Sequence, residues 1–320
     1  MACDAVPGAA AHGRLVRGRF APSPSGRMHF GNVFSACLAW LSARSQGGEF
    51  IVRLEDIDPR CQDPRNAELI LDDLRWLGLD WDEEPLRQSG RGELYRAAME
   101  QLGQQARIYP CFCSRADLHA ASAPHASDGT PIYQGSCRGL SAEEVAQRRL
   151  RKDPAWRIEV PAEELEFCDR HMSWQRQQLA AECGDFVVRR SDGAYAYQLV
   201  VVVDDAASGV TEVVRGADLI GSTPRQLWLQ RLLGLPAPAY AHHPVLLAPD
   251  GKRLSKREKS LDMGELRSVH APQELLGHIA HLAGLLSEPQ PVELRELLGT
   301  FTWDKVPCAD ITLPTTTHLG

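Results

Sequence analysis

The chain has 320 residues, 43% of them hydrophobic and 24% charged, which is enough for one large domain with an insertion or for two domains. Its formal net charge of -7 argues against indiscriminate nucleic-acid binding, which needs a broad basic surface. No apolar run approaches the roughly 20 residues that span a bilayer, and residues 1–14 do not resemble a signal peptide. Scattered cysteines indicate free thiols in a reducing compartment, so we expect a cytoplasmic protein without membrane contact.

The first part of the chain alternates between strand and helix patterns. Apolar residues at 17–21 and at 50–54 predict two strands, and each is followed by a helical pattern, at about 32–47 and at 64–77. Asp63 and the proline after it form a typical helix start. Strand, helix, strand and helix at this spacing indicate a parallel sheet.

The alternation of strand and helix patterns stops between 109 and 190. This stretch contains cysteines, a Ser/Ala/Gly/Pro-rich loop at 120–131 and charged, helix-like segments. We interpret this stretch as an inserted domain. A sheet pattern then resumes with the apolar run 198–203, which we interpret as a strand that ends at two aspartates. A helix at 224–233 and a strand at 244–247 are predicted to follow before a Gly-Lys-Arg loop.

These patterns divide the chain into six predicted segments. They are an N-terminal extension (1–14), the first half of a nucleotide-binding fold (15–108), the inserted domain (109–190), the second half of the fold with a basic loop (191–260), a short helical region (261–298) and an irregular tail (299–320).

The first candidate site is the turn from Arg19 to Gly26, which feeds a helix through His29, Gly31 and Asn32. A glycine-bearing turn at a helix N-terminus can hold a phosphate chain through backbone N–H groups and the helix dipole. His29 can donate a hydrogen bond to phosphate oxygens as negative charge develops on them. A single histidine before a glycine is more often structural, so this motif is weak alone.

Two further stretches carry charge at strand ends. Glu55 follows the strand that ends at Leu54, and ligands in open parallel sheets bind beyond such carboxyl ends. Its carboxylate can hold an ammonium group, although an ordinary acidic loop is the simpler interpretation. Arg215 offers a fixed guanidinium fork that suits a carboxylate, with a structural ion pair as the alternative.

The loop from Gly251 to Arg257 carries Lys252, Arg253 and Lys256. A mobile loop with this much positive charge suits a leaving pyrophosphate, because such transition states are stabilised mainly by positioning and charge. Considered alone, the loop is better explained as a solvated basic turn.

Three cysteines stand close enough for a shared metal site. Cys111, Cys113 and Cys137 supply three thiolates and leave one place in a tetrahedral zinc shell, with free thiols as the alternative. Four side chains have a suitable spacing for that place: Asp117, His119, His125 and Tyr133.

The order and spacing of these motifs resemble the class I glutamyl-tRNA synthetase family over roughly 17–257. The stretch from His29 to Asn32 stands where the family has His-Ile-Gly-His, and the stretch from Arg253 to Arg257 stands where it has Lys-Met-Ser-Lys-Ser. Asn32 replaces the second histidine and Arg253 the first lysine, so we expect those two contacts to be made differently.

The resemblance implies an α/β fold of the class I synthetase type, in which a Rossmann-type parallel sheet carries an inserted zinc-bearing domain and a short helical C-terminal part. It implies a glutamate site of Arg19, Ser23, Glu55, Tyr197 and Arg215, and an ATP site of His29, Gly31, Asn32, Arg253, Ser255 and Lys256. Within these sets His29 and Lys256 are the expected catalytic residues. In short relatives of the family a tyrosine at the position of Tyr133 completes the zinc site.

The activity implied is ATP-dependent formation of glutamyl-adenylate, with Mg²⁺ accompanying the ATP and without need for tRNA. Two guanidiniums favour L-glutamate over neutral glutamine, because a buried unpaired arginine is costly. Only about sixty residues follow the basic loop, too few for the anticodon-binding region of the longer family members. The chain therefore resembles the short members that place glutamate on the queuosine base of tRNA(Asp).

Two alternatives remain at this point. One is a truncated synthetase that charges the 3′ end of tRNA(Glu). The other is a catalytically silent relative that serves as an RNA-binding module.

Overall fold

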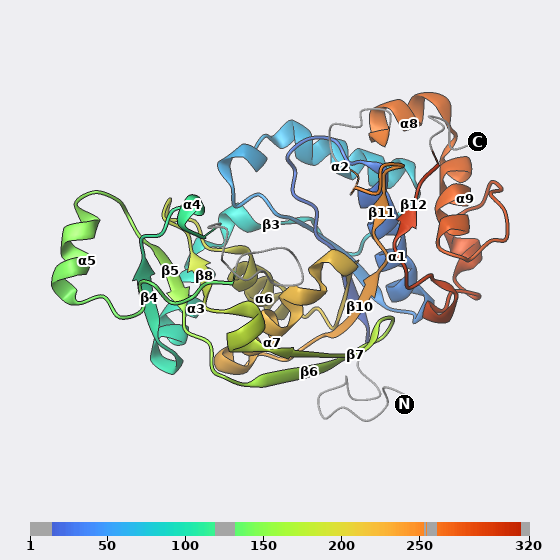
Figure 1. Ribbon diagram of the computed structural model, residues 1–320. Coiled ribbons are helices and arrows are strands. Elements are labelled where there is room, and N and C mark those ends of the chain that lie inside the picture. The colour runs from blue at the N-terminus through green and yellow to red at the C-terminus, as the bar shows by residue number, and fades with distance from the viewer. Residues whose placement is uncertain (1–14, 119–131, 253, 255–260, 315–320) are drawn as a thin grey trace.

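The structure is a computed structural model and describes residues 15–118, 132–252, 254 and 261–314 (Figure 1). The predicted N-terminal extension lies outside these ranges. The first sheet has the order β1-β2-β3, and all of its strands are parallel. Its elements are β1 (Arg17–Phe20), α1 (Phe30–Ser45), β2 (Glu49–Leu54), α2 (Pro64–Trp76) and β3 (Leu86–Arg87). Both predicted strands and both predicted helices are therefore confirmed, with bounds shifted by one to two residues.

A second sheet has the order β7-β6-β10-β9 and holds the other half of the parallel core. Its strands are β6 (Glu164–Asp169), β7 (Ser173–Gln178), β9 (Glu212–Gly216) and β10 (Ala239–His243). β10 runs parallel to both β6 and β9, whereas β7 is an antiparallel edge. β9 also lies beside β1, because the Thr211 N–H donates to the Arg17 carbonyl at 3.0 Å.

A small antiparallel sheet, β4-β5-β8, forms the end of the molecule at the left of Figure 1. Its elements are β4 (Ile108–Cys111), α4 (Arg115–Leu118), α5 (Ala142–Arg149), β5 (Ala155–Ile158) and β8 (Phe186–Arg189). α5 and the short α4 match the charged, helix-like character expected here, and Ser141 caps α5 by accepting from the Glu144 N–H at 3.2 Å. Strands therefore predominate where charged helices were expected.

The apolar run 198–203 forms a helix, so the predicted strand is wrong. This helix, α6 (Tyr197–Ala207), packs against α3 (Gly92–Gln105) and α7 (Thr223–Leu233). Four consecutive valines favour a strand locally, but Val200 to Val203 are buried on all sides in the same apolar cluster as Leu102 of α3 and Leu229 of α7. Tertiary burial thus outweighs local propensity. α7 confirms the helix predicted from 224.

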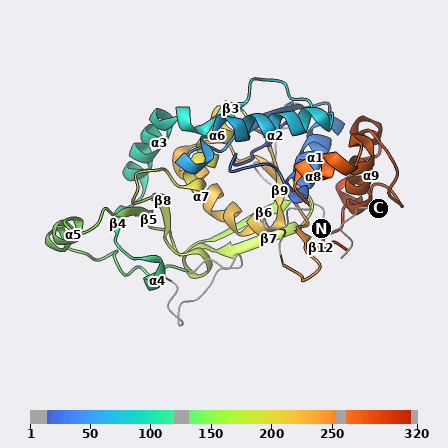
Figure 2. The ribbon, with the colours of Figure 1, turned by 90° about the horizontal axis from the view of Figure 1, so that it is seen from above.

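The C-terminal part lies against the first sheet on the side of α1 (Figure 2). It contains α8 (Met263–Val269), α9 (Pro272–Leu282) and β12 (Ile311–Thr312), and β12 pairs in parallel with β11 (Leu246–Leu247). The strand expected at 244–247 is therefore short, and the longer strand β10 that precedes it was missed. In the described ranges, no helix combines the length and the apolar character that crossing a membrane requires.

Candidate active site

The N-terminus of α1 is built by His29 and the residues that follow it. The His29 side chain accepts a hydrogen bond from the Gly31 N–H at 3.1 Å through Nδ1, and the His29 N–H donates to Asn32 Oδ1 at 3.1 Å. A neutral imidazole that accepts at Nδ1 carries its proton on Nε2, so Nε2 is the donor that it can offer to a ligand. A Cβ on Gly31 would lie 3.0 Å from His29 Cε1, so a side chain at this position would crowd the imidazole.

Asn32 has a defined task at the position of the family's second histidine. Its Oδ1 is occupied by the His29 backbone, which completes a reciprocal cap at the start of α1. The amide NH₂ group is then the part of Asn32 that can donate to an anion. A phosphate group at this position would therefore meet an amide and not an imidazole.

Arg215 lies on β9 and is 6% exposed. Its Nε donates to His242 Nε2 at 3.0 Å, and its two Nη atoms donate to Gln226 Oε1 at 2.9 Å and to Thr223 Oγ1 at 2.8 Å. Its guanidinium also lies 5.4 Å from the ring centroid of Tyr240. No described carboxylate forms an ion pair with Arg215, so its direct contacts are with neutral groups and with the Tyr240 ring, and Asp205 acts on it only through space.

A buried network of charges joins Arg19, Arg53, Glu55 and Asp205. Asp205 of α6 accepts from Arg53 and lies 3.5 Å from Arg19 Nε, while Arg53 Nη2 donates to Glu55 Oε1 at 3.3 Å. Burial lowers the pKa of Arg19, and burial also raises the pKa of Glu55 above its usual range. The pKa of Asp205 is lowered, because Arg53 and Arg19 outweigh the effect of its burial. Glu55 therefore lies at the edge of this network, in which Asp205 is the carboxylate that stays ionised.

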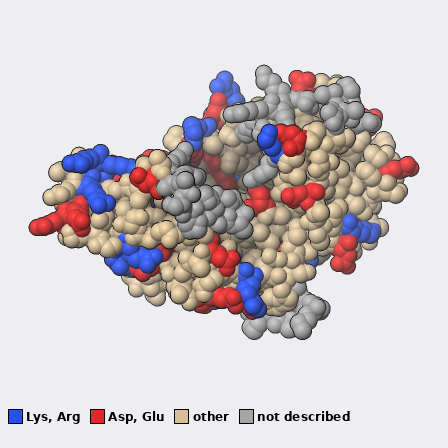
Figure 3. All heavy atoms as spheres, in the orientation of Figure 1, with Lys and Arg blue, Asp and Glu red and all other residues tan. Residues whose placement is uncertain are grey.

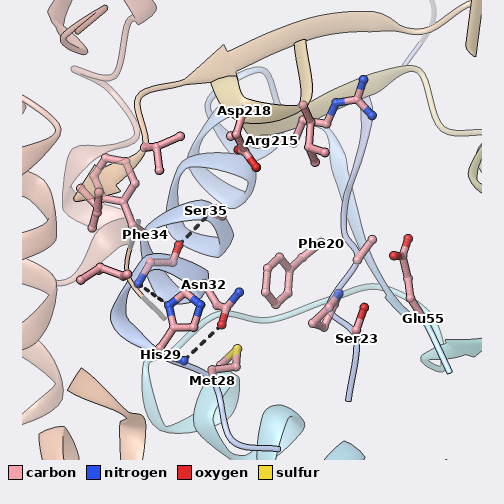
Figure 4. Close-up of a pocket in the computed structure, with 18 of the residues that line it drawn as sticks. Phe20, Ser23, Met28, His29, Asn32, Phe34, Ser35, Glu55, Arg215 and Asp218 are labelled. Atoms are coloured by element: carbon pink, nitrogen blue, oxygen red, sulfur yellow. Dashed lines mark hydrogen bonds between the residues drawn. The ribbon is translucent and has the colours of Figure 1, made fainter. Parts of the chain in front are cut away.

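One cavity of about 530 Å³ is lined by eight of the predicted site residues. They are Arg19, Ser23, His29, Gly31, Asn32, Glu55, Tyr197 and Arg215. Figure 4 shows Ser23 and Glu55 on one side and His29 and Asn32 on the other. The predicted ATP-site residues Arg253, Ser255 and Lys256 lie outside the described residues, although Leu254 beside them lines the same cavity.

Three lining residues were not singled out from the sequence. Phe34 of α1 stacks edge-on against His243, with ring centroids 5.4 Å apart. His243 follows β10's other histidine, and burial lowers its pKa to about 4, so its ring is neutral. Asp218 stands just after β9 and faces the same cavity (Figure 4). The polar pair His242-His243 at the end of an otherwise apolar strand is the signal that could have found His243.

The three cysteines also meet. The sulfur atoms of Cys111, Cys113 and Cys137 all lie within 4.8 Å of one another, and Cys113 Sγ is 3.7 Å from Cys137 Sγ. Thiolates bound to one tetrahedral zinc at about 2.3 Å are about 3.8 Å apart, so this spacing fits that ion. The Tyr133 hydroxyl accepts from the Cys137 N–H at 2.6 Å, which places its oxygen beside the cluster.

Asp117 is less suited to that shell, since its Oδ2 accepts from the Ser114 N–H at 2.6 Å and from the Ser114 hydroxyl at 2.8 Å. His119 and His125 lie outside the described residues. Among the described candidates for the fourth ligand, the geometry favours Tyr133.

The cavity offers a carboxylate and two buried guanidiniums at one end, and a helix N-terminus with a histidine donor at the other. A ligand with one cationic and two anionic groups matches the first end, and a phosphate chain matches the second. Comparison with known proteins agrees with this chemistry. The family described as tRNA synthetases class I (E and Q), catalytic domain, matches residues 15–299.

Named relatives are similar over nearly the whole chain. A glutamyl-Q tRNA(Asp) synthetase of Symbiobacterium thermophilum is 49% identical over 95% of this chain and 97% of its own length. One of Geobacter sulfurreducens is 47% identical, over 89% of this chain and 88% of its own. A glutamate tRNA ligase of Elizabethkingia meningosepticum, solved in complex with its amino acid, is 26% identical with a TM-score of 0.78 and covers 95% of this chain and 68% of its own.

The fold is thus that of the class I aminoacyl-tRNA synthetases, which are ligases. The sequence identity to the named relatives, and the share of both chains that is covered, place this chain in one family within that class. The chain belongs to the glutamyl-Q tRNA(Asp) synthetase family.

Proposed function

We propose that this protein activates L-glutamate with ATP and Mg²⁺, without tRNA, and transfers the glutamyl group to the queuosine base in the anticodon loop of tRNA(Asp). The observation that carries the first half is the environment of Arg215. A guanidinium that is 6% exposed and touches only neutral partners calls for an anion from outside the protein.

Glutamate fits this end of the cavity group by group. Glu55 holds its ammonium, Arg19 and Arg215 each meet a carboxylate, and Ser23 and Tyr197 add hydrogen bonds. Tyr197 is 37% exposed, which leaves its ring accessible to a ligand that enters the cavity. Glutamine would leave one of the two guanidiniums without a charged partner, and such a loss discriminates strongly.

In the reaction proposed, an oxygen of the glutamate α-carboxylate attacks the α-phosphorus of ATP. A new P–O bond forms, the bond between the α- and β-phosphates breaks, and pyrophosphate leaves with the electron pair. His29, Gly31, Asn32, Arg253, Ser255 and Lys256 are the proposed ATP contacts. Among them His29 and Lys256 stabilise the charge that develops on the phosphates. A queuosine hydroxyl then attacks the mixed anhydride and releases AMP.

Queuosine as acceptor rests on the relatives, which are named for tRNA(Asp) and match the chain nearly end to end. Their names favour it over the 3′ end of tRNA(Glu), and over a silent RNA-binding role. On the face shown in Figure 3, several Lys and Arg side chains lie at the end formed by α5, next to Asp and Glu side chains. A local basic surface suits the phosphates of an RNA arm even though the net charge is -7. We also propose a cytoplasmic location, where ATP and tRNA are found.

We further propose that Cys111, Cys113, Tyr133 and Cys137 hold one structural zinc ion. Arg157 lies 4.0 Å from the centroid of the Tyr133 ring, and Arg148 Nη1 is 4.0 Å from Cys137 Sγ. These two cations offset part of the negative charge that three thiolates bring to the site.

Exchange of labelled pyrophosphate into ATP in the absence of tRNA tests the activation step. We expect exchange with glutamate and at least about a hundredfold less with glutamine. Arg215→Gln should lose most of the exchange, because it removes a charged hydrogen-bond donor. A matched control is Arg231→Gln on α7, whose side chain is exposed and pairs with Glu163. Equal exchange with both amino acids would contradict the proposal.

A further inference from the structure

Two buried side chains behind Arg215 form a directional chain of hydrogen bonds with it. Asp169 and His242 are both 0% exposed, and neither lines the cavity. His242 Nδ1 lies 2.6 Å from Asp169 Oδ2, and His242 Nε2 lies 3.0 Å from the Nε of Arg215. The contact with Arg215 fixes the direction of the hydrogen bond between His242 and Asp169. A guanidinium has only donors, so Nε2 accepts and Nδ1 carries the proton that it donates to Asp169.

The fold brings these three residues together on neighbouring parallel strands. His242 on β10 is in register with Arg215 on β9, and Asp169 on β6 is in register with Tyr240, two residues before His242. Asp169 is held by the backbone as well. Its Oδ1 accepts from the N–H groups of His171 at 3.0 Å, Met172 at 2.8 Å and His242 at 3.1 Å. The Asp169 end of this series of hydrogen bonds is therefore rigid.

The hydrogen bonds that Arg215 makes within the protein limit how many N–H donors it can offer to a ligand. Of the five N–H donors of a guanidinium, three are used by His242, Gln226 and Thr223 in the described structure, which leaves two for a ligand. We propose that Asp169 and His242 are positioning residues for substrate selection. By fixing the Nε of Arg215, they aim its two remaining donors at one carboxylate of the amino acid. This inference rests on the proposed function, since it assigns that carboxylate to glutamate.

A pair of variants at His242 separates positioning from packing. The amide nitrogen of His242→Asn stands near the place of Nδ1 and keeps the contact to Asp169, but it loses the acceptor for Arg215. The carbonyl oxygen of His242→Gln stands near the place of Nε2 and keeps that acceptor. In glutamate-dependent pyrophosphate exchange, we expect His242→Asn to raise KM for glutamate about tenfold or more and to leave KM for ATP within about twofold. His242→Gln should recover most of the affinity.

Asp169→Asn tests the donor-to-acceptor direction of the hydrogen bonds that link Arg215, His242 and Asp169. The amide keeps an oxygen for the backbone N–H groups but presents its NH₂ to His242, which then accepts at Nδ1 and carries its proton on Nε2, facing the donor of Arg215. We expect a rise in KM for glutamate similar to that of His242→Asn. The double variant should be no worse than either single one, because both changes break the same chain.

His171→Asn is the matched control. His171 is a buried histidine whose Nε2 lies 3.0 Å from the Pro307 carbonyl and whose ring lies tilted against that of Trp303, with the ring centroids 5.2 Å apart. We expect it to lower stability without changing KM for glutamate. If the wild-type protein is active and His242→Asn leaves that KM unchanged, or changes it no more than His171→Asn does, the inference is wrong. Absence of glutamate-dependent exchange in the wild-type protein would instead overturn the proposed function, and this inference with it.

Discussion

The buried guanidinium of Arg53 donates a hydrogen bond to the carboxylate of Asp205, and this pair joins β2 to α6. Asp205 also lies 3.5 Å from Nε of Arg19, which lines the cavity. One carboxylate thus serves a structural cation and a cation of the site. Its neighbour in sequence, Asp204, takes a different set of partners: it accepts from Arg91 at 2.6 Å, Gln88 at 2.8 Å and Tyr95 at 2.9 Å.

This arrangement predicts different results for two adjacent variants. Asp205→Asn should lower the free energy of unfolding by about 3 kcal/mol, because the buried guanidinium of Arg19 loses its carboxylate partner and that of Arg53 keeps only Glu55. It should also raise KM for glutamate, since Arg19 is no longer held. Asp204→Asn should lower stability but leave that KM unchanged. Urea unfolding and pyrophosphate exchange measure the two effects, and an equal change in KM for both variants would refute the division of roles.

The raised pKa of Glu55 predicts an acid limb in the pH profile, that is, a loss of activity at low pH. Burial favours the protonated form, so as pH falls Glu55 becomes neutral at a pH above the ordinary 4.5 of a glutamate and can no longer hold an ammonium group. We expect kcat/KM for glutamate to fall in that range. Glu55→Gln should be less active at neutral pH and should lack this limb. Observation of the same limb in the variant would assign it to another group.

The basic loop supplies a test that needs only the sequence. Lys256→Ala should slow pyrophosphate exchange by well over tenfold, because a positive charge at the leaving pyrophosphate is lost. Lys252→Ala is the control. Lys252 is an exposed lysine whose ammonium lies 2.6 Å from Asp250, and its loss should change the rate less than about twofold. Unimpaired exchange in Lys256→Ala would remove this residue from the mechanism.

The cysteine cluster predicts one zinc ion per chain by elemental analysis of the purified protein. Cys113→Ser and Cys137→Ser should lose the metal and unfold at lower temperature, since a bound structural metal contributes to folding. Cys308→Ser should keep both metal and stability, because Cys308 is exposed and lies near His171, far along the chain from the cluster. A metal content near zero in the wild-type protein would contradict the zinc site.

Much of the site could be predicted because its residues stand in short motifs at element ends. Gly31 marks a helix start and Glu55, directly after Leu54, marks a strand end, and both residues line the cavity. The helix that begins at Pro64 was predictable for a similar reason, since Asp63 accepts from the Arg65 N–H as a cap does.

Long-range pairing could not be predicted in the same way. The run of valines before Asp204 is typical of a strand, and only its burial between α3 and α7 makes it a helix. The contact of Asp169 with His242 depends on the order β6-β10-β9, which brings together residues 73 positions apart. Neither residue carries a local signal of that partner.

The most direct test of the central claim is transfer of labelled glutamate to tRNA(Asp) whose 3′ diol has been removed without periodate. Because periodate also attacks the diol of queuosine, the 3′ end is better removed by trimming the terminal adenosine, and tRNA(Asp) without queuosine serves as the matched control. We expect labelling of trimmed, queuosine-containing tRNA(Asp) and none of the queuosine-free form. Labelling that requires the intact 3′ end, or that appears on tRNA(Glu), would contradict the account.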